Sequence, residues 1–182
     1  MYGLVHKSMR DYIKSSNGDK AWSDIESKLS LDESSFLALH AYDDAIIYGM
    51  VGAACEKLGK PADELLKAFG EYWITVTAKK SYGPLLNSYG ASTFELCANL
   101  DAMHKHFAST FVGYRPPGFK TRSLTENSIS LEYSSDRNGL VPFVEGLLSG
   151  MGILFEESLE ITCIHVDESD GCVAKFVITK TH

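Results

Sequence analysis

The spacing of the apolar residues changes once along the chain, and this change limits the folds that the chain can adopt. Through the first 110 or so residues, apolar side chains recur every three or four positions, as on one face of an α-helix. From Asn127 to Arg137 they alternate instead, which is the period of a half-buried strand. Between the two stretches, Tyr114-Arg-Pro-Pro-Gly118 stops helix formation. The pattern predicts an α+β fold, with a helical N-terminal lobe and a C-terminal lobe of antiparallel sheet plus helices.

Local signals divide these stretches into elements. One helix is predicted from Asp43 to Gly59, and Pro61 opens the next. Residues 82–85 contain Gly and Pro and predict a break, after which a helix begins near Ser92 and carries an apolar stripe that ends at Phe111. A further helix is expected over 141–155. The chain then forms a hairpin, with strands over 159–166 and 172–181.

The overall composition restricts the class of protein. The chain has 182 residues, which suits one domain. Within it, a helical lobe is expected over about 1–60 and a mixed lobe over about 61–182. A net charge of -7 argues against nucleic acid as the main partner. No run approaches the roughly 20 apolar residues of a membrane span, and the N-terminus lacks a signal-peptide pattern, so a cytoplasmic protein is expected. His6 and His40 are expected at the surface or at a helix edge.

Tyr133, Ser135 and Arg137 form a group, here called the 133/135/137 trio, whose spacing of two places all three on one face of a strand. A phenol, a hydroxyl and a guanidinium together suit a pair of ligand carboxylates. His104 lies at the edge of the apolar face of its helix, where it could ligate a metal. A flat apolar molecule with two carboxylates and a central metal is haem. Taken singly, a His at a helix edge is usually packed or solvated, and the alternating trio could be the wet face of a strand.

In combination these residues resemble the haem nitric oxide/oxygen binding (H-NOX) family, which includes the haem domain of soluble guanylate cyclase. His104, Pro117 and the 133/135/137 trio have the order and approximate spacing of that family. The resemblance covers essentially the whole chain, including Met1-Tyr-Gly-Leu-Val5, Phe69-Gly70 and Arg115-Pro-Pro-Gly-Phe119. It implies a single sensor domain over residues 1–182, with haem b buried between a distal helical lobe and a proximal lobe that contains the sheet.

The resemblance implies a role for each matching residue. His104 would be the proximal ligand of the haem iron. The 133/135/137 trio would hold the haem propionates through charge-assisted hydrogen bonds. Pro117 occupies the position that presses on the porphyrin and holds it out of plane.

Gas selectivity depends on the distal side of the haem. Family members that bind oxygen stably use a distal Tyr, and Phe143 stands at that position here, without a donor. We therefore expect the protein to bind nitric oxide and carbon monoxide and to exclude oxygen. Trp73 aligns with another distal position; its indole N–H could donate, but its place in an apolar stripe favours a bulky wall. Val5, Leu147 and Met103 are predicted as further apolar lining.

The resemblance also implies how the signal would leave the domain. Nitric oxide weakens the bond trans to it, so the Fe–His104 bond would lengthen or break and release the helix around Leu100 to Phe107. The sequence shows no output domain, so a separate signalling protein, a histidine kinase or a cyclic-di-nucleotide enzyme, would read the change.

Other function classes remain open from the residues alone. A haem enzyme such as a peroxidase needs a distal acid–base pair, whereas the predicted distal residues are apolar or aromatic. An oxygen-binding or redox-responsive haem protein, or a cofactor-free module for a hydrophobic acid, would use the same cavity. We expect a sensor that is not an enzyme.

Cys163, His165 and Cys172 flank the C-terminal turn and form a partial set of zinc ligands. Cys163 and His165 are two apart, so they would share a strand face. The alternatives are reduced thiols, which we favour, and a Cys163–Cys172 disulfide.

Overall fold

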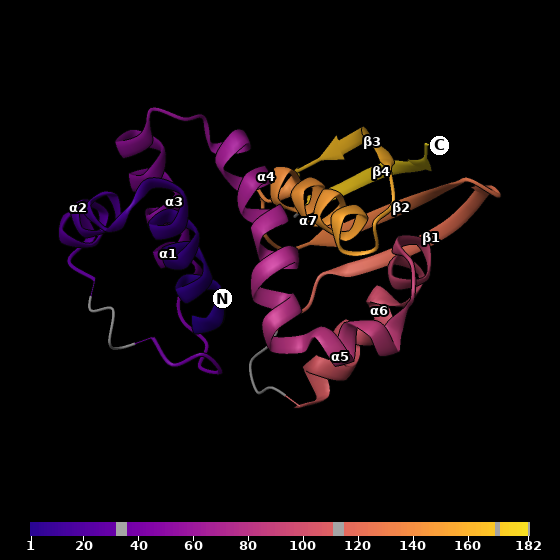
Figure 1. The fold of residues 1–182 in the computed structure, drawn as a ribbon, viewed down its shortest axis with the longest axis horizontal. Coiled ribbons are helices and arrows are strands. Elements are labelled where there is room, and N and C mark those ends of the chain that lie inside the picture. The colour runs from indigo at the N-terminus through magenta and orange to yellow at the C-terminus, as the bar shows by residue number, and fades with distance from the viewer. Residues whose placement is uncertain (32–35, 111–114, 170–171, 182) are drawn as a thin grey trace. The chain divides into compact units, whose positions relative to one another are not determined.

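The computed structural model describes residues 1–31, 36–110, 115–169 and 172–181, so Phe111, Tyr114 and part of the C-terminal turn lie outside the described residues. The chain forms two compact units, Met1–Phe69 and Gly70–His182. The described residues form helices and one four-stranded antiparallel sheet, which confirms the predicted α+β class (Figure 1). The prediction that residues 1–182 act as a single sensor domain stays a prediction. No helix among the described residues is long and apolar enough to cross a membrane.

The first unit is helical. It contains α1 (Gly3–Asn17), α2 (Asp19–Leu29), α3 (Asp44–Leu58) and most of α4 (Ala62–Tyr72). As predicted, α3 begins after Asp43, whose carboxylate accepts the backbone N–H of Ala45, and ends at Gly59 in the left-handed conformation. Apolar residues at helical spacing form the core of this unit: Met9, Ile13, Trp22, Ile25 and Met50 are almost fully buried.

His6 is also part of this core. Its ring is fully buried and stacks on Phe36, with the ring centroids 4.8 Å apart. The expected position at the surface or at a helix edge is therefore wrong, because His6 falls on the buried stripe of α1 with Met9 and Ile13.

The second unit begins with a continuous helical segment in which α4 passes into the π-helix η2 (Trp73–Ala78) and then α5 (Lys79–Tyr89). The break predicted at residues 82–85 does not occur, and Pro84 lies inside α5. Pro84 and Lys80 are both exposed, so water can hydrogen-bond the Lys80 carbonyl that Pro84 leaves without a helical donor. The helix α6 (Thr93–Thr110) follows and carries His104.

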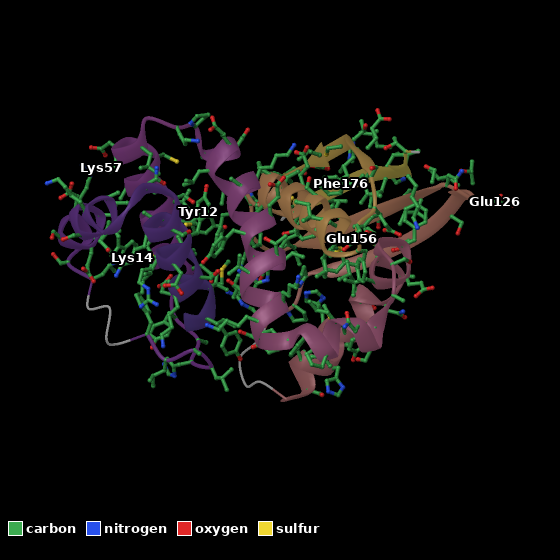
Figure 2. All side chains as sticks on the ribbon, in the orientation of Figure 1. Tyr12, Lys14, Lys57, Glu126, Glu156 and Phe176 are labelled. Carbon is green, nitrogen blue, oxygen red and sulfur yellow. The ribbon has the colours of Figure 1, made fainter. Side chains whose placement is uncertain are left out.

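The sheet of this unit contains β1 (Gly118–Thr125), β2 (Ser128–Ser135), β3 (Leu159–Asp167) and β4 (Cys172–Lys180) in the order β1-β2-β4-β3. The turn between β1 and β2, at Glu126, forms the tip of a long hairpin (Figure 2). Alternate residues of β2 and β4 point inward, and Leu131, Phe176 and Ile178 are fully buried against α6 and α7 (Val141–Leu154). Burial of each such side chain stabilises the fold by about 1.5–3 kcal/mol. The sheet therefore supplies a rigid support for the residues at the ends of its strands.

Candidate functional site

His104 lies on α6 with one ring nitrogen already engaged. Its Nδ1 is 2.7 Å from the carbonyl oxygen of Leu100, one helical turn earlier, so the Nδ1–H donates to that carbonyl. This hydrogen bond selects the tautomer whose Nε2 carries the lone pair that a metal requires. Burial lowers the pKa of His104, against the opposing effects of the Leu100 carbonyl and the Asp101 carboxylate. The imidazole is therefore neutral at pH 7, as an iron ligand must be.

Phe119 on β1 connects His104 to the trio. The centroid of the Phe119 ring lies 5.1 Å from that of His104 and 5.7 Å from that of Tyr133. Phe119 and Tyr133 are paired across the β1–β2 ladder, and both are buried. The structure thus packs the predicted ligand and one predicted propionate-binding residue against the same aromatic ring.

The end of β2 positions the remainder of the 133/135/137 trio. The strand ends at Ser135, two residues earlier than the alternating pattern predicts, yet the pattern of burial continues through Arg137. The Ser135 hydroxyl accepts the backbone N–H of Arg137, at 3.1 Å, and this bond turns the chain out of the sheet. The trio therefore comes from one strand end and the turn that follows it.

Arg137 is held by its neighbours rather than extended into water. Its side chain is 14% exposed, Nη1 donates to the carbonyl oxygen of Arg115 at 3.1 Å, and the same nitrogen lies 3.6 Å from the Asp136 carboxylate. Asp136 is itself 2.8 Å from Arg115 Nη1, so its charge is shared between two guanidinium groups. A largely buried guanidinium, on the turn that follows a strand bearing a phenol and a hydroxyl, provides donors of the kind that suit a carboxylate pair.

Pro117 lies half-buried immediately before β1, two residues from Phe119. Met103 is buried in the core of the second unit, next to His104 in sequence. These two residues are carried by the same elements, α6 and the start of β1, that carry His104 and Phe119.

The predicted distal residues of the second unit lie on two helices that approach closely. Phe143 and Leu147 are on α7, and Trp73 is the first residue of η2. Trp73 and Leu147 are partly buried against the core of this unit, and their roles as pocket lining stay predictions. Val5 lies on α1 of the first unit, so its predicted role in lining the cofactor stays a prediction.

The partial zinc set is not formed. A β-bulge lies between Cys163 and His165, so the two side chains do not share a face: Cys163 packs against the core, and His165 is exposed. The residues that the structure describes contain no group of three or more His, Cys, Asp or Glu side chains arranged to hold a metal ion. The zinc alternative is therefore wrong for this geometry.

The C-terminal cysteines are free thiols. Cys163 pairs with Phe176, four residues along β4 from Cys172, which is about 13 Å of strand and too far for a disulfide. Burial and the nearby Glu168 carboxylate raise the pKa of Cys172 to about 11.

Sequence reasoning named the ligand and the trio but missed Phe119 and Asp101. The Asp101 carboxylate forms an ion pair with Lys105 Nζ, at 2.6 Å, and Lys105 together with the nearby backbone N–H of Phe119 lowers the pKa of Asp101. One signal for Phe119 was available, because it ends the Arg115–Phe119 block just before the chain becomes extended. Its register opposite Tyr133, which gives it its importance, needed the structure.

Comparison with known proteins gives the family of this chain. The family model described as haem-NO-binding matches residues 2–163. Soluble guanylate cyclase gcy-31 of Caenorhabditis elegans is 23% identical over 168 residues, which are 92% of this chain and 24% of that protein. This chain thus spans about a quarter of the length of that curated relative.

Solved structures agree in fold. An H-NOX protein from S. oneidensis in the Fe(II) ligation state, a triple mutant, superposes with a TM-score of 0.89 at 19% identity, over 100% of this chain and 97% of that one. An oxygen-binding H-NOX domain related to soluble guanylate cyclases superposes with a TM-score of 0.87 at 19% identity, over 100% and 96% of the two chains. With a family model that matches nearly the whole chain, these findings show that the chain belongs to the haem-NO-binding, or H-NOX, family.

Proposed function

We propose that this chain is a haem-based sensor of diatomic gas that binds nitric oxide and carbon monoxide, excludes oxygen and signals to a separate protein. The observation that carries the proposal is the neutral imidazole of His104, whose Nδ1–H donates to the Leu100 carbonyl. The Phe119 ring packs against both this imidazole and the Tyr133 ring. In the proposed complex, His104 Nε2 would hold the iron. Tyr133, Ser135 and Arg137 would hold the two propionates.

Haem, when bound, supplies a ferrous iron with one coordination position open to a gas molecule. The chain's own residues decide which gas is retained. Oxygen held in the proposed pocket would gain from a hydrogen-bond donor on the chain, whereas nitric oxide and carbon monoxide would depend on one far less. Phe143 offers no donor, which supports exclusion of oxygen.

His104 also provides the route for a signal. It is the only protein ligand proposed for the iron, and its helix α6 is tied to β1 by the Thr121 hydroxyl, which donates to the Cys97 carbonyl at 3.0 Å. A change in the attachment of His104 therefore acts on α6 and, through β1, on the sheet. The reading of that change by a histidine kinase or a cyclic-di-nucleotide enzyme is part of the proposal.

Absorption spectra of the purified ferrous protein test the proposal. We expect a Soret band that shifts with nitric oxide and with carbon monoxide but not with air. His104→Gly should lose haem unless imidazole is supplied, while His106→Gly, two residues along the same helix, should keep it. A colourless protein that cannot take up haemin would overturn the proposal, and peroxide turnover would favour a haem enzyme instead.

A further inference from the structure

We propose that Phe119 is a positioning residue that fixes the orientation of the His104 imidazole, and that the Asp101 carboxylate holds Phe119 in place. The inference rests on the proposed function, because it assigns a role toward the iron ligand. It concerns this chain's own residues and the contacts between them.

The Phe119 ring restricts a rotation that the hydrogen bond to Leu100 leaves open. The Nδ1–H bond fixes the tautomer of His104 and one edge of its ring. The second side-chain torsion of a His is otherwise broad, so the ring can rock about that edge. Phe119 packs against the imidazole at 5.1 Å with the ring planes tilted by 41°, and this contact limits the rocking. The two contacts together set the direction of the Nε2 lone pair.

Phe119 can serve as a support because its own position is fixed on several sides. Phe119 is 8% exposed, and its ring packs on Tyr133, with the planes tilted by 45°. Its backbone is in register with Tyr133 on β2, and its N–H lies near the Asp101 carboxylate. The sheet therefore carries the ring, and α6 is attached to the same residue.

Asp101 completes the link within one turn of helix. It lies three residues before His104, a spacing that places both side chains on neighbouring positions of the α6 surface. Its carboxylate pairs with Lys105 on its own helix and lies near the Phe119 backbone N–H on β1. Two residues of α6 therefore contact Phe119: His104 contacts its ring, and Asp101 lies near its backbone N–H.

The test uses conservative variants with a matched control. Phe119→Leu keeps apolar volume but removes the flat ring, and Phe176→Leu makes the same change at a fully buried site of the same sheet. In the haem-loaded ferrous protein we expect Phe119→Leu to bind haem, yet to shift and broaden the Fe–His stretching band measured by resonance Raman spectroscopy. Phe176→Leu should lose stability and keep the wild-type band.

A second pair of variants tests Asp101. Asp101→Asn keeps an oxygen that can accept the Phe119 N–H, and should retain the wild-type band. Asp101→Ala removes the acceptor, and should shift the band in the direction seen for Phe119→Leu.

Nuclear magnetic resonance of the haem-free protein separates this inference from the proposed function. We expect cross-peaks between the His104 and Phe119 rings, and additional or broadened His104 ring signals in Phe119→Leu. An unchanged Fe–His band together with a single sharp set of His104 ring signals in Phe119→Leu would overturn the inference. Failure of the wild-type protein to take up haem would overturn the proposed function, and the haem-free spectra would still decide the role of Phe119.

Discussion

A methyl group on Gly70 of α4 would lie 2.3 Å from the carbonyl oxygen of Phe143 on α7. It would also lie 2.7 Å from the backbone nitrogen of Leu147, so the obstacle is backbone and cannot rotate away. Gly150, farther along α7, approaches Ile74 and Glu71 in a similar way. Small residues therefore let the two helices meet backbone to backbone, and this contact sets the position of Phe143.

Gly70→Ala is expected to destabilise the protein. The overpacked contact should lower the free energy of unfolding by about 1–3 kcal/mol. Gly52→Ala is the control: Gly52 is exposed on α3 with no atom in the way of a methyl group, so the change should stabilise by about 0.5–1 kcal/mol. Chemical denaturation of both variants measures the difference. Equal stability of Gly70→Ala and the wild type would contradict the close approach.

Phe143→Tyr is expected to create oxygen affinity. The added hydroxyl would supply the hydrogen-bond donor that the proposed gas pocket lacks at this position. The measurement is the absorption spectrum of the ferrous protein in air, compared with the wild type. Trp73→Phe is the matched variant, because it removes an indole N–H and should leave the wild-type response to air unchanged. Stable oxygen binding by the wild type that Trp73→Phe abolishes would show that Trp73, not position 143, controls selectivity.

The sequence predicted those parts of the fold whose burial follows a simple period. The alternation of Ile129, Leu131 and Tyr133 marks β2 because that face of the strand packs on the core, while polar residues occupy the other face. The predictions failed where a local rule was overridden. Pro84 stays within α5 at an exposed position, where water can hydrogen-bond the Lys80 carbonyl that loses its helical donor. The bulge after Cys163 turns His165 away from the core.

The candidate site was predictable in part for the same reason. His104 and the 133/135/137 trio are short-range patterns that a single sequence displays. The roles of Phe119 and Asp101 depend on the register of β1 against β2 and on the packing of α6 against β1. Such pairings join residues far apart in sequence, and no local period encodes them.

Glu157→Gln is expected to weaken the start of α6. The Glu157 carboxylate accepts the Thr93 backbone N–H at 2.9 Å and pairs with Lys180 Nζ at 2.6 Å. Hydrogen bonds to charged groups contribute about 1.5–3 kcal/mol each, so the neutral amide should lower the free energy of unfolding by about 1–2 kcal/mol. Glu56→Gln, which breaks an exposed ion pair with Lys28, is the control and should cost under about 1 kcal/mol. Similar losses in the two variants would contradict a structural role for Glu157.

The same carboxylate has a predictable pH dependence. Burial favours the protonated form, but the Lys180 ammonium and the Thr93 N–H outweigh it, so the pKa of Glu157 is lowered. A carboxyl group whose pKa is lower in the folded than in the unfolded chain stabilises the fold at pH values above the unfolded-state pKa. This stability is lost as the pH falls through the folded-state pKa. Denaturation below about pH 4.5, the ordinary pKa of Glu, should therefore show less acid sensitivity in Glu157→Gln than in the wild type.

His6→Phe is expected to reduce the acid sensitivity of the first unit. Burial lowers the pKa of His6, and the hydrogen bond to the Tyr2 carbonyl, 3.0 Å from Nδ1, only partly opposes this. Its Nε2 is buried with no hydrogen-bond partner among the described residues, so the folded unit resists a second proton on the ring.

Acid lowers the stability because His6 binds a proton more readily in the unfolded chain than in the folded one. As the pH falls below about 6.5, the unfolded chain protonates His6 before the folded chain does, and stability decreases by up to about 1.4 kcal/mol per pH unit. Replacement by Phe should keep the stacking on Phe36 and remove this term, so the free energy of unfolding should vary less between pH 7 and 5. Met9→Leu, also fully buried on α1, is the control: it should change stability by a similar amount at every pH. If His6→Phe retained the full pH dependence of the wild type, the buried imidazole would not be its source.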